Sequence, residues 1–157
     1  MQLFAKDLMS QQYDIIHQDA LVKQAVEQIL MGDTRPTGHK NVSLMVVDDD
    51  NTLVGTISMY YILYYLRPSY MLFGIDSSEV SVRAEVEEFV KLVQNKKVRD
   101  IMNTDGITAN PNDSMMTVLD RMMRNRLRRI PVVDKGTMVG IVYMTDIFHF
   151  LFDKKMA

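Results

Sequence analysis

Two spacings of apolar residues alternate along this chain. Short runs rich in β-branched residues come in pairs, LMVV with LVGTIS and RIPVV with TMVGIVY, joined by the turn signals DDDN and DKG. Such pairs predict antiparallel strands connected by tight turns. Between them, apolar residues three and four apart predict helices with one buried stripe: Met115, Val118, Leu119 and Met122 in one, and Val82, Val86, Phe89, Val90 and Val93 in another.

The pattern occurs twice. AKDLM, beginning at Ala5, matches VRDIM, beginning at Val98, and LMVVDDDNTLVGTIS matches IPVVDKGTMVGIVY. Each copy is predicted to run strand, helix, strand, turn, strand, helix. In the second copy the short strand is GITA, Asn112 or Asp113 caps the next helix, and Thr145 caps the last one. About seven extra residues fall in the first copy, where GDTRPTGHKN has loop chemistry.

A segment between the copies matches neither of them. Pro68 ends the preceding helix, and Asp76 to Ser78 provide a start for a new one. Its apolar residues follow a single stripe, while Arg83, Glu85, Glu87, Glu88 and Lys91 make the other face charged. We expect a linker helix that lies on the pair of copies or on a partner chain.

The composition of the chain excludes several classes of function but does not point to one. A chain of 157 residues with a formal net charge of -2 has no general attraction for nucleic acid or an anionic membrane. It has no cysteine, so disulfides and thiolate metal sites are excluded. The beginning lacks a signal-peptide pattern, and the apolar run YYILYYL is too short to span a bilayer, which makes the cytoplasm the default.

In order and spacing, these motifs resemble a tandem of CBS domains, the module named after cystathionine β-synthase, paired as a Bateman module. VRDIM, ITANPNDS, RRIPVVD and MVGIVYMTDI carry the resemblance in the second copy, and AKDLM and LMVVDDDNTLVGTIS in the first. The resemblance implies an α/β fold: two βαββα repeats packed through their sheets about a pseudo-twofold axis, with an inserted linker helix. The expected units are repeat 1 at 1–66, linker at 67–97 and repeat 2 at 98–157.

CBS pairs of this kind sense energy state or metabolites by binding AMP, ADP, ATP or S-adenosylmethionine in clefts between the repeats, and commonly form disc-shaped dimers. The resemblance implies an adenosine site in repeat 2, where Asp146 binds the ribose, Arg128 and Arg129 bind phosphate, and Thr108 contacts the adenosine. Ile130, Pro131 and Val132 would form an apolar wall for the adenine. Tyr143 stands where the family usually has a smaller hydroxyl residue, which changes the phosphate contact.

Each of these residues also has a purely structural interpretation. Asp146 suits the first turn of any helix, because the helix dipole favours an acid there. The arginines end the run RNRLRR, which could instead pair with acids of a dimer partner. Thr108 could simply be a strand former. In the first copy, Ile15, Val42, Ser43 and Tyr61 replace Thr108, Arg128, Arg129 and Asp146, and only Ser58 keeps a hydroxyl, so we expect a degenerate first-copy site.

Two hypotheses for the function follow. The first is a stand-alone regulatory module that is not an enzyme, needs no cofactor or metal, binds an adenosyl ligand, and relays occupancy to an unidentified effector protein. The second is a ligand-free scaffold for dimerisation. Tyr60, Tyr61, Tyr64 and Tyr65 crowd one short helix, and tyrosine is enriched at interfaces, so both hypotheses predict a homodimer. Neither predicts contact with nucleic acid or membrane.

Overall fold

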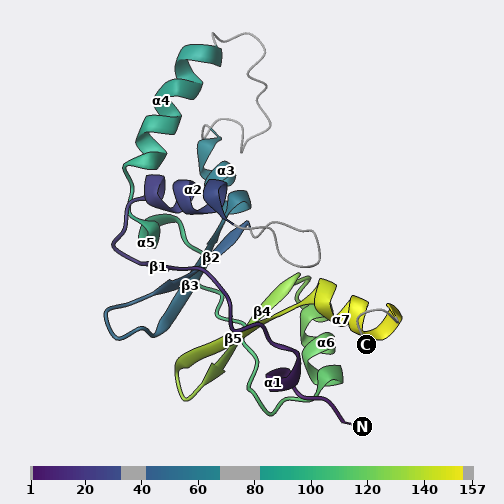
Figure 1. Ribbon diagram of the computed structural model, residues 1–157. Helices are drawn as coiled ribbons and strands as arrows, with labels where there is room; N and C mark the ends of the chain where they lie inside the picture. Colours follow the sequence, from purple (N-terminus) through teal and green to yellow (C-terminus); the bar gives the residue numbers. More distant parts are fainter. Residues whose placement is uncertain (1, 33–41, 68–81, 154–157) are drawn as a thin grey trace.

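The computed structural model describes residues 2–32, 42–67 and 82–153. Figure 1 shows two α/β units side by side. The strands are β1 (Ile15–His17), β2 (Ser43–Val47), β3 (Leu53–Ser58), β4 (Arg129–Asp134) and β5 (Thr137–Tyr143). The helices are α1 (Ala5–Leu8), α2 (Val22–Met31), α3 (Met59–Leu66), α4 (Val82–Gln94), α5 (Val98–Ile101), α6 (Met115–Arg124) and α7 (Met144–Phe152).

The first unit is a three-stranded sheet in the order β1, β2, β3, with α2 and α3 packed on it (Figure 1). Ile15 of β1 pairs in parallel with Met45 of β2, and Ser43 of β2 pairs antiparallel with Ser58 of β3. Leu44, Val46 and Ile57 join residues of α2 and α3 in one core. The predicted hairpin is confirmed, with Asn51 at its turn in a left-handed conformation.

The second unit has the same arrangement, but its first strand, at the edge of the sheet, is shorter. Its hairpin of β4 and β5 is confirmed, but the predicted strand GITA is reduced to one parallel bridge between Ala109 and Val132. Ala109 N–H donates to Pro131 O at 2.9 Å, and its carbonyl accepts from Val133 N–H at 2.9 Å. Gly106, at φ 64°, and Pro111 bracket this segment, so the extended backbone cannot continue far in either direction.

The helix starts in the second unit differ from those predicted. Ser114, not Asn112 or Asp113, caps α6, and its Oγ accepts from Thr117 N–H at 3.2 Å. Asp113 is unavailable as the cap because its Oδ2 already accepts from Asn110 N–H at 2.9 Å. Helix α7 begins directly after β5, with Tyr143 rather than Thr145 at the cap position.

The two short helices cross between the units. Helix α1 precedes the first unit in sequence, yet Ala5 N–H donates to Asp113 O at 2.8 Å, and Ala5 lies in the core of the second unit. Conversely, α5 precedes the second unit, yet Val98 N–H donates to Ala20 O at 2.8 Å, and Val98 lies in the first core. Each repeat therefore lends its opening segment to the other.

The AKDLM and VRDIM motifs recur because they shape these crossing segments. Asp7 Oδ2 accepts from Phe4 N–H at 2.9 Å, and Asp100 Oδ2 accepts from Lys97 N–H at 3.2 Å, so each acid caps its own short helix. The methionine that ends each motif then packs on a glycine of the opposite hairpin. A Cβ on Gly140 would lie 2.6 Å from Met9 Sδ, and one on Gly55 would lie 2.9 Å from Met102 Sδ.

The two sheets also pack on one another. A third apolar cluster joins the hairpins across the pseudo-twofold axis, and Thr52 bridges Thr137 at their tips. Its members come from both units: Met45 and Leu53 from the first, Met138, Ile141 and Tyr143 from the second, and Tyr13 from the chain before β1. The architecture predicted for the pair, two βαββα repeats packed through their sheets, is confirmed.

Helix α4 lies along α2 and α3 of repeat 1 (Figure 1). Val93 is its most buried described residue, at 4% exposure, while Glu87, Glu88 and Lys91 face outward. The start expected at Asp76 to Ser78 and the loop expected at 33–41 lie outside the described residues. In the part of the chain that the structure describes, no helix is long and apolar enough to cross a membrane.

Candidate functional site

The predicted ligand residues of repeat 2 gather at one end of its sheet. Arg129, at the start of β4, lies opposite Tyr143, at the end of β5. Ala109 forms a parallel bridge with Val132 of β4. The segment that contains Thr108 and Ala109 therefore lies beside the strand that begins with Arg129 and Ile130. Helix α7 starts directly after Tyr143 and carries Asp146 in its first turn. The topology thus brings the backbone segments that carry Thr108, Arg129 and Asp146 to the same end of the sheet.

The two arginines differ in their surroundings. Arg128 is exposed, and its carbonyl accepts from Met144 N–H at 2.9 Å, which ties the start of β4 to the start of α7. Arg129 is half-buried, and burial lowers the pKa of its guanidinium, as does the nearby charge of Arg128, while Tyr143 acts in the opposite direction. An arginine remains cationic despite such a shift, so this sheet end holds a concentrated positive charge.

The three residues expected to form an apolar wall for the adenine are all buried. The side chains of Ile130 and Val132 are 0% exposed and lie in the core of repeat 2, packed under α6 and α7. Successive strand residues face opposite sides of a sheet, so Pro131 between them is turned away from that core. Pro131 is itself buried, so none of the three residues is exposed in this structure.

Tyr143 is also drawn inward. Its ring is 6% exposed and packs with Met45 of repeat 1 and Met138 of repeat 2. A smaller hydroxyl residue at this position would leave space in the interface between the sheets, which the phenol ring fills instead. Tyr143 therefore links the two repeats at the edge of the candidate site.

The corresponding end of repeat 1 is arranged differently. Ile15 is 41% exposed, and Ser58 is 8% exposed with its Oγ accepting from Tyr61 N–H at 3.3 Å as the cap of α3. Burial raises the pKa of Tyr61, and nearby Asp105 raises it further, while a hydrogen bond with Asn103 lowers it. Ser58 and Tyr61 thus have structural contacts of their own, and Val42 and Ser43 stand where repeat 2 has its two arginines.

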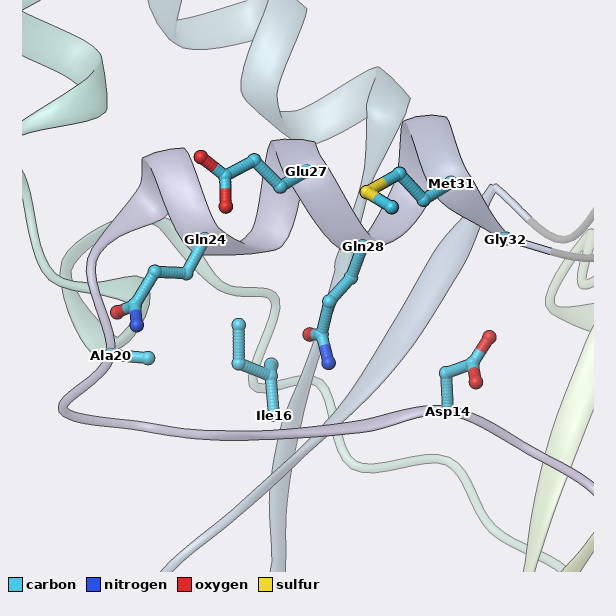
Figure 2. Close-up of a pocket in the computed structure, with 8 residues that line it drawn as sticks. All are labelled: Asp14, Ile16, Ala20, Gln24, Glu27, Gln28, Met31 and Gly32. Atoms are coloured by element: carbon cyan, nitrogen blue, oxygen red, sulfur yellow. The ribbon is translucent and has the colours of Figure 1, made fainter.

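A cavity lies elsewhere, at the outer edge of repeat 1. It has a volume of about 540 Å³ and lies between α2 and the chain that forms β1 (Figure 2). Its described lining residues are Asp14, Ile16, Ala20, Gln24, Glu27, Gln28, Met31 and Gly32. Sequence reasoning missed this cavity. The available signal was a difference between the copies, since Ala20 and Gln28 stand where repeat 2 has Asp113 and Arg121.

Metal ligands are sparse in the described part of the chain. No group of three or more His, Asp or Glu side chains there is arranged to hold a metal ion. His17 Nε2 lies 2.6 Å from Asp49 Oδ1, and Asp48 Oδ1 accepts from Asp50 N–H and Thr52 N–H, both at 2.9 Å. These contacts order the hairpin turn of repeat 1.

Comparison with known proteins identifies the class. The CBS domain family matches residues 5–68 and 98–153, and the chain belongs to this family. An uncharacterized protein of Methanocaldococcus jannaschii is 26% identical over 147 residues, which cover 93% of this chain and 42% of that protein. A second uncharacterized protein of the same organism is 31% identical over 122 residues, covering 68% of this chain and 70% of that protein. The chain thus spans under half of the first relative.

Solved structures share the whole architecture. The CBS domain of a CBS domain containing membrane protein from Sphaerobacter thermophilus has a TM-score of 0.68 and 26% identity, with 94% of this chain and 86% of that chain covered. The CBS domain pair of protein MJ0100, solved in complex with 5′-methylthioadenosine and S-adenosyl-L-methionine, has a TM-score of 0.65 and 19% identity, covering 96% and 97%. The second likeness shows the fold alone.

Proposed function

We propose that this chain is a cytoplasmic regulatory module in which residues 1–66 and 98–157 are the sensing repeats and 67–97 the linker. It binds an adenosine-containing ligand, such as AMP, ADP, ATP or S-adenosylmethionine, mainly through repeat 2. Ligand binding changes the packing of the pair, and a partner protein reads that change. In this proposal the chain has no catalytic role, and it needs no cofactor other than the regulatory ligand.

One observation supports the proposal: the strand that begins with the two arginines and the helix that carries Asp146 both start at the same end of the sheet. Arg128 and Arg129 start β4, and the Arg128 carbonyl is bonded to the first residue of α7, the helix that carries Asp146. A carboxylate accepts hydrogen bonds from the two hydroxyls of a ribose, and guanidinium groups bind phosphate oxygens. The adenosyl compounds in the MJ0100 complex are consistent with this ligand class.

Thermal unfolding in excess AMP, ADP, ATP, S-adenosylmethionine, NAD or adenosine tests the proposal. A ligand at 100 times its Kd adds about 2.7 kcal/mol, which for this chain length is a midpoint shift of roughly 5 to 10 °C. We expect Asp146→Ala to abolish the shift, because the ribose loses its acceptor. Asp134→Ala is the matched control, since Asp134 is an exposed acid at the opposite end of β4.

Two results of this experiment would contradict the proposal. A shift that survives in Asp146→Ala contradicts the role given to that carboxylate. No shift with any adenosyl compound contradicts the sensor proposal and favours the scaffold.

A homodimer formed through the helices is the second part of the proposal, and it is shared by the scaffold hypothesis. The observation that favours it is the exposed apolar surface of α3, where Tyr60 is 68% exposed, Leu63 54% and Tyr64 43%. Tyr61 is a poorer probe, because it is half-buried. We expect Tyr60→Glu with Tyr64→Glu to shift the chain from dimer to monomer in sedimentation velocity. A dimer unaffected by this pair of charges contradicts an interface on α3.

A further inference from the structure

The cavity at the open edge of repeat 1 has the chemistry of a cation site. Asp14 and Glu27 contribute carboxylates and Gln28 contributes an amide, and no Lys or Arg is present among the described lining residues. The amide oxygen of Gln24 is already used, because it accepts from Leu21 N–H at 2.9 Å. Figure 2 shows Gln24 and Gln28 reaching from α2 toward the strand, with Asp14 rising from the chain beside Gln28. Among the described residues, neither carboxylate forms an ion pair. A volume of about 540 Å³ is within the range of small-molecule sites.

Repeat 2 fills the corresponding place with its own guanidinium. Arg121 occupies the position that matches Gln28, and its Nη1 donates to Thr108 O at 2.9 Å and to Asp113 Oδ2 at 2.8 Å. Asp113 matches Ala20 of repeat 1. The pair that closes the edge of repeat 2 is therefore absent from repeat 1, and the cavity lies where it would be.

The backbone acceptor that Arg121 uses is also present in repeat 1. Asp14 O faces β2, because it accepts from Met45 N–H at 3.0 Å. Carbonyls alternate in direction along a strand, so the next carbonyl, that of Ile15, faces the open edge of the sheet. Ile15 matches Thr108, whose carbonyl binds Arg121. A guanidinium entering the cavity would therefore find the same strand carbonyl and, in place of Asp113, the carboxylate of Asp14.

We propose that this cavity binds the guanidinium group of a small molecule, in the place that the Arg121 side chain takes in repeat 2. The planar fork of a guanidinium donates to a carboxylate and a carbonyl together, which a compact ammonium does not match. Asp14 and Glu27 repel phosphate, so this site differs from the adenosyl site of repeat 2. The inference does not depend on the proposed function, and either can fail without the other.

Titration calorimetry with agmatine, a small guanidino compound, tests the inference at fixed ionic strength. We expect one binding site in the wild-type chain and roughly tenfold or greater weakening in Asp14→Asn, because a charge-assisted hydrogen bond is lost. Asp134→Asn is the control for net charge, and butane-1,4-diamine is the control for a cation without the guanidinium. No binding of agmatine, or equal binding of the diamine, overturns the proposal.

A second variant fills the cavity from within. Ala20→Asp with Gln28→Arg transplants the pair of repeat 2 into repeat 1, and we expect it to abolish agmatine binding while raising the midpoint of thermal unfolding. Unchanged agmatine binding in this variant would show that the probe binds elsewhere and would overturn the site. If the double variant does not fold, as judged by circular dichroism, Asp14→Asn still decides, because Asp14 is an exposed residue whose backbone contacts are kept.

Discussion

The outer edge of the sheet is open in repeat 1 and closed by Arg121 in repeat 2. The two repeats share their crossing segments and their order of elements, except that a single bridge at Ala109 takes the place of β1 in repeat 2. The edges differ in two side chains, Asp113 and Arg121 in one repeat and Ala20 and Gln28 in the other. A duplicated fold can therefore keep one architecture while each copy develops a different site.

The helical faces of the repeats differ in a second way. Helix α4 covers α2 and α3, burying Val93 to 4% exposure and leaving an apolar cavity of about 230 Å³ between the three helices. The matching face of repeat 2 has no such cover among the described residues, and Leu151 is 45% exposed where the matching Leu66 of repeat 1 is half-buried. One linker helix can cover only one of two equivalent faces, which makes the pair asymmetric.

The largest effect on stability is expected where the crossing segments contact a glycine of the opposite repeat. We expect Gly55→Ala to lower the free energy of unfolding by about 2 to 3 kcal/mol, at the upper end of overpacking costs. The reason is that its Cβ would lie 2.7 Å from the backbone oxygen of Asn103, which also pairs with Thr56. Gly140→Ala should cost less, because its close contacts are all with the flexible side chain of Met9. Urea unfolding of both variants measures the difference.

A double variant tests whether crowding by the side chain of Met9 causes the loss of stability. Adding Met9→Ala to Gly140→Ala removes the crowding atoms, so the double variant should lose less stability than the sum of the two single variants. Equal effects of Gly55→Ala and Gly140→Ala, with no relief by Met9→Ala, would contradict a crossing contact as the source of the cost.

The fold was largely predictable because hairpins and helices have local signals that occur twice. The partner of each crossing segment was not, since AKDLM and VRDIM specify a capped short helix without specifying the repeat on which it packs. Local competition also hid the cap of α6. Asn112, Asp113 and Ser114 are adjacent cap residues. Asp113 Oδ2 is engaged by Asn110 N–H and by Arg121, and Ser114 takes the role of the cap.

The strand positions of the predicted ligand residues could be predicted more readily than the directions of their side chains. The sequence places Arg129 and Tyr143 at the ends of paired strands, and the structure has them opposite one another. It does not show that Ile130 and Val132 turn into the core, because a run that is apolar at every position hides which face each residue takes. The cavity of repeat 1 was missed because it depends on side chains that are absent.

An effect of intermediate size is expected when the guanidinium of Arg121, which closes the sheet edge of repeat 2, is removed. We expect Arg121→Met to lower the free energy of unfolding by about 1 kcal/mol, since it removes two charge-assisted hydrogen bonds at a partly exposed position. Gln28→Met, at the matching position of repeat 1, should change stability little, because the Gln28 side chain is exposed and borders an open cavity. Thermal unfolding of both variants tests this, and equal losses would contradict the assigned difference between the edges.

The smallest expected effect is a dependence on pH that only repeat 2 contributes. The hydrogen bond from Asn110 N–H lowers the pKa of Asp113, and the hydrogen bond and charge of Arg121 lower it further, against an opposing effect of burial. A carboxyl whose pKa is lower in the folded state stabilises the fold fully above its unfolded pKa, about 3.9. That contribution is lost as the pH falls below 3.9 through the folded pKa.

Asp113→Asn should therefore lower stability at pH 7, and the gap to wild type should close as the pH approaches 3. Urea unfolding across this range measures it. Repeat 1 has Ala20 at the matching position and cannot contribute, so transplanting the pair by Ala20→Asp with Gln28→Arg should add a second acid-sensitive term. If the gap between Asp113→Asn and wild type stays constant with pH, the carboxylate acts through packing and not through its charge. The edge of repeat 2 would then be closed by the shape of Arg121 alone.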